Sequence, residues 1–307
     1  MKYFVIVNPI SGRGLGEKSV PAIEAYLRKA GVEYKLVRTE RPWHAAELAE
    51  QAARERYDVI VSASGDGTFN EVLNGLMRAR KAGFNHAALG VIAIGTGNDF
   101  AGGVGIPDDF EKSMEVLMAD KRKKIDIGLV SGGDYPEGRY FGNGIGIGFD
   151  AVVTIRSHKL PILRGFLMYL TAVIQTIILN HAPALLKIET DTESWQQDTI
   201  MLTVCNGPRE GGGFLVAPEA KNTDGVLNYA TVTQCSRLTM FRLVPEVMKG
   251  THGRFKQVRL GTFKKLSLTS DRPLYMHADG EIYTSFGSNL RSLTFENLPG
   301  ALQVVKG

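Results

Sequence analysis

The segment Asp58–Asn70, DVIVSASGDGTFN, decides the fold prediction. Its first five residues, DVIVS, form a short β-branched run that is typical of a buried strand, and the glycine-rich turn SGDGT follows two residues after that run. A helical pattern then begins, with Phe69, Val72, Leu73 and Leu76 on one face. A buried strand, a glycine turn and a helix in this order build parallel sheets, so we predict an α/β domain.

The same alternation runs through the first half of the chain. It predicts a mostly parallel, Rossmann-like sheet with helices on both faces. The predicted strands are 3–8, 33–38, 58–62 and 89–94, and the predicted helices are 18–30, 43–56, 69–80 and 107–119.

The second half has a different pattern. From residue 124 onward β-rich runs such as KIDIGLV, TIMLTVCN and KKLSLTS predominate, and only 160–179 and 238–249 look helical. We therefore predict an all-β, sandwich-like second domain, with a nucleotide-binding cleft between the two domains. The expected domains are 1–124, joined by a C-terminal return over 296–307, and 125–295.

Composition excludes several classes of protein. The 307 residues suggest two domains, and 44% hydrophobic residues exclude a disordered chain. The net charge of +4 is too small to favour nucleic acid as a partner. Two cysteines, Cys205 and Cys235, cannot form a disulfide framework, which favours a reducing, cytoplasmic location.

One apolar stretch, 160–179, could contact a membrane. Arg164, Gly165 and Gln175 interrupt it, so we favour a helix that is buried or docked on a bilayer over a helix that spans one. The N-terminal run MKYFVIVNPISG has no small-residue cleavage site and is better explained as a first strand than as a signal peptide.

Three glycine-rich loops each follow an apolar strand: NPISGRG at 8–14, SGDGT at 64–68 and GTGND at 95–99. Ligands of open parallel sheets bind beyond the carboxyl ends of the strands, and glycine amides at a helix start favour phosphate. Any one loop alone would be explained better as a tight turn. The chain lacks the P-loop motif, and the first loop does not fit G-x-G-x-x-G, which disfavours a Rossmann-type oxidoreductase.

Asp66 lies inside the second of these loops. A carboxylate would repel phosphate unless a cation or an ordered water lies between them, so Asp66 indicates phosphoryl transfer with Mg²⁺. The alternative is an Asx turn in which Asp66 bonds only its own loop.

Five motifs in this order carry a resemblance: SGDGTFNEV, GTGNDFA, FGNGIGIGFDA, GGGFLVAPEAKNTDGVL and DGE. Together they resemble the diacylglycerol kinase catalytic-domain family, and within it the soluble bacterial lipid kinases. NAD kinases and sphingosine kinases share GDGT, but the later motifs make the match specific. The matching motifs extend from Asn8 to Glu281, with Ser64 and Ala93 standing where the family usually has Gly and Pro.

The resemblance implies a site for ATP that is assembled from several loops. The implied nucleotide-binding residues are Asn8, Pro9, Ser11, Gly12, Thr39, Gly65, Asp66, Gly67, Thr68, Asn70, Glu71, Thr96 and Asn98.

Two roles for Mg²⁺ are also implied by the resemblance. Asp126, in KIDIG, would join Asp66 in a network of aspartates, water and Mg²⁺. A structural Mg²⁺ would be held by Asp224 and by the backbone carbonyls of Lys221 and Val226, since hard cations accept carbonyl oxygens. From the residues alone, the Asp-Gly pair at 224–225 first indicates a turn between strands.

The DGE turn would supply the general base, either Glu281 or Asp279. Without the resemblance, Asp-Gly at this place indicates an ordinary β-turn. The resulting hypothesis is an ATP-dependent lipid kinase that converts diacylglycerol to phosphatidic acid at the inner face of the membrane, through peripheral contact. The alternatives are another lipid acceptor, NAD as acceptor, or a non-catalytic nucleotide- or membrane-sensing protein. A homodimer formed through an edge strand is also open.

Overall fold

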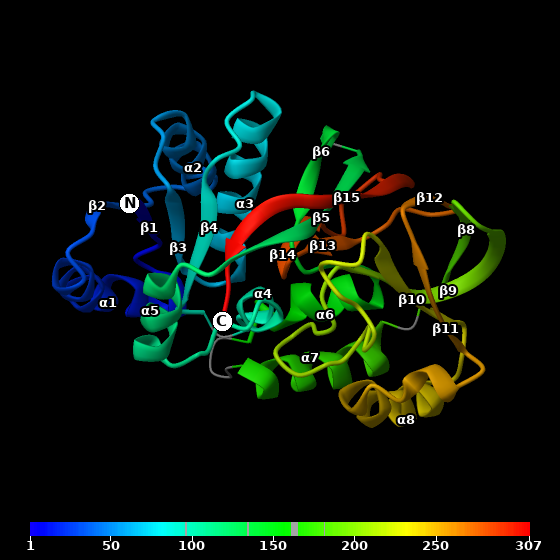
Figure 1. Ribbon diagram of the computed structural model, residues 1–307. Coiled ribbons are helices and arrows are strands. Elements are labelled where there is room, and N and C mark those ends of the chain that lie inside the picture. Colours follow the sequence, from blue (N-terminus) through cyan, green and yellow to red (C-terminus); the bar gives the residue numbers. More distant parts are fainter. Residues whose placement is uncertain (96, 134, 161–164, 181) are drawn as a thin grey trace. The chain divides into compact units, whose positions relative to one another are not determined.

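The structure is a computed structural model that describes residues 1–95, 97–133, 135–160, 165–180 and 182–307 (Figure 1). The chain forms two compact units. Unit 1 comprises residues 1–125 and 300–307, and unit 2 comprises residues 126–299. The chain passes between the units within strands β5 (Arg122–Gly132) and β15 (Ser292–Val305).

Unit 1 is an α/β unit with a parallel sheet. Its strands lie in the order β4-β3-β1-β2, and Val304 of β15 pairs in parallel with Leu89 of β4. The strands are β1 (Lys2–Val7), β2 (Glu33–Arg38), β3 (Val59–Ser64) and β4 (Ala88–Ala93). The helices are α1 (Ser11–Lys29), α2 (His44–Arg54), α3 (Asp66–Lys81), α4 (Asp99–Gly103) and α5 (Phe110–Ala119).

Successive side chains of these buried strands point to opposite faces of the sheet, so both faces are apolar and both are covered by helices. Tyr3, Val5 and Val7 of β1 share one buried cluster with Ile23 of α1 and Met114 of α5. Helices α2 and α3 lie on the other side of the sheet (Figure 1). The predicted parallel α/β architecture is therefore confirmed.

The start of α1 differs from the prediction of a helix over 18–30. The assigned range begins at Ser11, but Gly12, Arg13 and Gly14 have left-handed backbone angles, with φ of 56°, 59° and 91°, so the regular helix begins after Gly14. Two of these three residues are glycines, which adopt positive φ without a steric penalty, so the break costs little conformational free energy. The kink leaves the first loop as a distinct turn ahead of the regular helix.

Unit 2 is β-rich, as predicted, and is built almost entirely of antiparallel strands. Its strand order is β14-β13-β7-β9-β8-β12-β15, with β10 pairing to β9 and β11, and β6 pairing to β5. The strands are β6 (Tyr135–Phe141), β7 (Gly144–Gly148), β8 (Ala184–Thr190), β9 (Ser194–Cys205), β10 (Leu227–Thr233), β11 (Val258–Phe263), β12 (Lys265–Ser270), β13 (Met276–Ala278) and β14 (Glu281–Thr284).

Two buried clusters hold unit 2 together. One lies among the strands and includes Phe141, Ile145, Leu202 and Phe295. The other joins strand residues to the helices α6 (Phe149–Ser157), α7 (Gly165–Leu179) and α8 (Arg237–Lys249). The sandwich-like fold class is thus confirmed, but the expectation of only two helices was wrong. Helix α6 is rich in β-branched residues, which weaken the local helical signal, so packing decides its conformation.

Candidate functional site

The three glycine-rich loops of unit 1 meet at the carboxyl ends of its parallel strands. The Nδ2 of Asn8, after β1, donates a 2.8 Å hydrogen bond to Oγ1 of Thr68, in the first turn of α3. A Cβ atom on Gly95 would lie 2.6 Å from the Cα of Gly65. Segments far apart in the sequence therefore touch, and the last two loops approach so closely that only glycine fits.

Two carboxylates face this meeting point. A Cβ built on Gly97 would lie 2.8 Å from Oδ2 of Asp66 and 3.7 Å from Oδ2 of Asp99. Asp66 is the first residue of α3 and Asp99 the first of α4. Two carboxylates aimed at one place offer the hard oxygen ligands that Mg²⁺ prefers, so the residues present fit this ion. Asp99 has no assigned role in the sequence prediction; its position beside a glycine at a strand end was the available signal.

Helix α3 begins directly at the second loop. Gly65 is its N-cap residue, in extended conformation, so the backbone N–H groups of the first turn point out of the helix at this loop. Such an N-terminus attracts anions through its free amides and the helix dipole. Ser64, one departure from the family pattern, contacts Ser62 at 2.7 Å and turns its hydroxyl into the fold.

Several predicted nucleotide-binding side chains also stabilise unit 1. Asn98 accepts a hydrogen bond from the backbone N–H of Gly95 and so shapes the third loop. Glu71 accepts a 3.2 Å bond from the N–H of Ala45, which caps α2, and Asn70 is fully buried within α3.

The other predicted residues of this site lie on the loops named above or beside them. Thr39, just after β2, donates its backbone N–H to the carbonyl of Val7. Pro9, Ser11, Gly12 and Gly67 lie in the first and second loops, and Thr96 lies outside the described residues.

The DGE turn in unit 2 is a two-residue hairpin loop between β13 and β14. Asp279 and Gly280 have φ of 48° and 78°, as the mirror-image hairpin turn requires, and Ala278 pairs with Glu281 across it. The alternative interpretation of Asp-Gly as a β-turn therefore describes its backbone correctly.

The two acidic residues of this turn have different surroundings. Asp279 is 5% exposed, and its carboxylate accepts backbone N–H bonds from Gly142, Asn143 and Gly144 at 2.8–2.9 Å. Both carboxylate oxygens of Asp279 thus attach the turn to the start of β7 and the two residues before it. Glu281 begins β14 with a partly exposed side chain.

Asp126 lies at the start of unit 2 and is bonded to the loop after residue 221. Its N–H donates to the carbonyl of Asn222, and its Oδ2 accepts from the N–H of Gly225, both at 2.7 Å. Oδ1 of Asp224 accepts a 3.3 Å bond from the N–H of Val226, which is the turn expected from the residues alone. The Mg²⁺ roles of Asp126, Lys221, Asp224 and Val226 remain predictions.

Family models match almost the whole chain. The diacylglycerol kinase catalytic domain matches residues 2–130, and the YegS C-terminal NAD kinase beta sandwich-like domain matches residues 143–306.

Curated relatives agree with these matches. A diacylglycerol kinase of Staphylococcus haemolyticus is 27% identical over 294 residues, covering 94% of this chain and 84% of that relative. A diacylglycerol kinase of Staphylococcus aureus (strain JH9) is 29% identical, covering 94% of this chain and 89% of that relative.

Solved structures share the fold. A provisionally assigned diacylglycerol kinase from Bacillus anthracis str. Sterne superposes with a TM-score of 0.81 at 23% identity, covering 100% of this chain and 97% of that one. The resemblance carried by the sequence motifs is therefore confirmed: the chain combines a diacylglycerol kinase catalytic domain with a C-terminal domain of the YegS family.

Proposed function

We propose that this protein is an ATP-dependent lipid kinase that phosphorylates the free hydroxyl of diacylglycerol to give phosphatidic acid. The observation that carries the proposal is the meeting of three glycine-rich loops with the carboxylates of Asp66 and Asp99 at the start of α3. Such a place suits a triphosphate and its divalent cation. The family and the names of the curated relatives support a lipid as the acceptor.

The chemistry assigned to the chain's own residues is simple. Loop amides and the N-terminus of α3 orient the phosphates, and Asp66 and Asp99 would hold Mg²⁺, which would offset the charge of the phosphate oxygens. Glu281 accepts the proton of the lipid hydroxyl as that oxygen attacks the γ-phosphorus in line. The bond between the γ-phosphorus and the bridging oxygen breaks, and ADP leaves with the electron pair.

Glu281 is the better candidate for the base because the carboxylate of Asp279 already accepts three backbone hydrogen bonds. These three N–H bonds hold both oxygens of the Asp279 carboxylate against residues 142–144, so this group is not free to turn toward an acceptor hydroxyl. The side chain of Glu281 is partly exposed and begins a strand next to the same turn.

Offering γ-labelled ATP and Mg²⁺ to the purified protein with a panel of acceptors tests the proposal. The panel contains diacylglycerol, monoacylglycerol, phosphatidylglycerol, a sphingoid base, ceramide and NAD. We expect label in phosphatidic acid at least about tenfold faster than in any other product, a difference of about 1.4 kcal/mol in transition-state binding. Label mainly in another acceptor would replace diacylglycerol, and label in none would favour the sensing protein.

Unit 2 also carries an apolar surface suited to a lipid substrate. Helices α7 and α8 pack against each other, and α7 leaves Leu167, Ile178 and Leu179 52–63% exposed. On α8, Leu238 is 70% exposed. No helix among the described residues is long and apolar enough to cross a membrane. We propose that this α7–α8 surface docks on the bilayer that contains the substrate.

Replacing Ile178 and Leu179 together by Ser is expected to weaken binding to diacylglycerol-containing vesicles at least about tenfold, because each buried aliphatic side chain contributes about 1.5–3 kcal/mol. Vesicle co-sedimentation measures this. Leu260→Ser is the matched control, since Leu260 is 40% exposed on β11 and outside the α7–α8 surface. Equal losses in both proteins, or none in the double variant, would exclude this surface as the docking site.

A further inference from the structure

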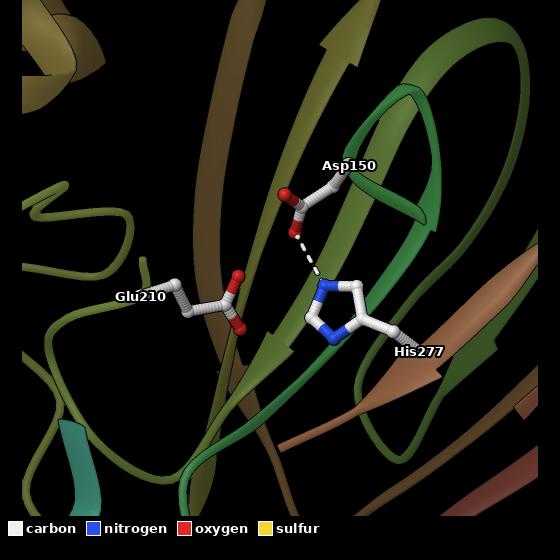
Figure 2. A group of neighbouring side chains, drawn as sticks. All are labelled: Asp150, Glu210 and His277. Carbon is white, nitrogen blue, oxygen red and sulfur yellow. Dashed lines mark hydrogen bonds and ion pairs between the residues drawn. The ribbon is translucent and has the colours of Figure 1, made fainter. Parts of the chain in front are cut away.

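Unit 2 contains a cluster of ionisable side chains that the proposed chemistry does not use. Figure 2 shows Asp150, Glu210 and His277 turned toward one another, with ligand-type atoms all within 4.8 Å of each other. Oδ2 of Asp150 lies 3.2 Å from Nε2 of His277. Asp150 lies in the first turn of α6, Glu210 lies in the loop after β9, and His277 lies on β13, two residues before the DGE turn.

The glycine pattern of β7 makes room for these three side chains. In the sequence GIGIG, Ile145 and Ile147 enter the strand-side core, and the glycines lie on the opposite face. A Cβ on Gly146 would lie 2.2 Å from both Asp150 Oδ2 and His277 Nε2. One on Gly144 would lie 2.2 Å from Glu210 Oε1. Because both glycines lack a Cβ atom, the polar side chains fill the space beside β7.

Glu210 and His277 are buried and Asp150 is half-buried, so most of this negatively charged cluster is shielded from water. His277 is 4% exposed, and its Nδ1 has no hydrogen-bond partner among the described residues. Buried carboxylates need a compensating positive charge.

We propose that Asp150, Glu210 and His277 form a binding site for a divalent transition-metal ion of the Zn²⁺ class. Zn²⁺ accepts imidazole nitrogens and carboxylate oxygens, and a site with three protein ligands is completed by a water in the fourth position. With bonds of about 2.1 Å, two ligands of a tetrahedral ion are about 3.4 Å apart, close to the separation of Asp150 and His277.

The imidazole also separates this site from the proposed Mg²⁺ site, because Mg²⁺ prefers oxygen ligands. The ion would tie β13, which carries the DGE turn, to α6 and to the loop of Glu210. Its expected role is structural: it compensates the buried charge and holds the hairpin in place.

The test measures Zn²⁺ directly and does not depend on kinase activity, so it can fail or succeed independently of the proposed function. Untagged full-length protein is stripped with a chelator and titrated with Zn²⁺ against a chromophoric competitor, and elemental analysis counts the bound ions. We expect one Zn²⁺ per chain. We expect Asp150→Asn, Glu210→Gln and His277→Gln each to weaken binding at least about tenfold. Zn²⁺ should also raise the Tm of the wild type but not of these variants.

Two controls address nearby and non-specific binding. Asp198→Asn makes the same chemical change at an exposed position of β9 and should bind Zn²⁺ like the wild type. Cys205→Ser should also retain binding, because the thiol is outside the ligand set. The absence of Zn²⁺ uptake by the wild type would overturn the proposal, and the cluster would then be held by hydrogen bonds alone. Zn²⁺ binding that persists in all three cluster variants would overturn it too, since the ion would then lie elsewhere. Circular dichroism checks the folding of each variant, and the comparison uses the variants that fold.

Discussion

The Glu281→Gln protein is expected to lose about 10²–10⁴-fold in kcat with a nearly unchanged Tm. A positioned general base contributes an acceleration of that size, and glutamine keeps the shape of the side chain but cannot accept the proton. Glu281 is partly exposed at the first position of β14, so the substitution leaves the core intact. Initial rates with saturating diacylglycerol and ATP, together with a thermal melt, measure both quantities.

Asp279→Asn is the matched comparison, two residues away in the same turn. Here the main expected loss is stability, about 1–3 kcal/mol, because the new amide group must face N–H donors that now meet a carboxylate. The Asp279 variant should therefore melt several degrees lower. If Asp279→Asn instead removed turnover without any change in Tm, and Glu281→Gln kept full turnover, the base would have to be reassigned to Asp279.

The Asp66→Asn protein is expected to lose about 10²–10³-fold in kcat and to need more Mg²⁺ for half-maximal rate. Asp66 lies at the first turn of α3 with its carboxylate aimed at the same place as that of Asp99. Removing one of the two proposed ligands would weaken the binding of the cation and its compensation of charge on the transferring phosphoryl group. Rates measured over a series of Mg²⁺ concentrations separate the loss of affinity from the loss of kcat.

Asp109→Asn provides the control in the same unit. Asp109 is the N-cap of α5 and accepts a 3.0 Å bond from the N–H of Lys112, a role that asparagine performs equally well. Its kinetics should match the wild type within about twofold. An Asp66→Asn protein with wild-type rate and an unchanged Mg²⁺ requirement would show that Asp66 only shapes its own loop.

The local sequence pattern alone was enough to predict the α/β half, the β-rich half and the positions of the three glycine-rich loops. Hydrophobic period and glycine position are properties of a few neighbouring residues, and the physics of strands, helix starts and tight turns acts over the same short range. Where packing outweighs local preference, the pattern failed. It did not reveal α6, whose β-branched residues are held helical by their neighbours, or the left-handed turn at residues 12–14 that interrupts α1.

The chemistry of individual carboxylates required the folded chain. Asp279 and Glu281 are equivalent in sequence, and only the three amides from residues 142–144, more than a hundred positions away, distinguish them. Asp150 and His277 are 127 positions apart and meet because β13 pairs with the glycine strand β7. Burial, charge and hydrogen bonding depend on such distant neighbours, which a one-dimensional pattern does not contain.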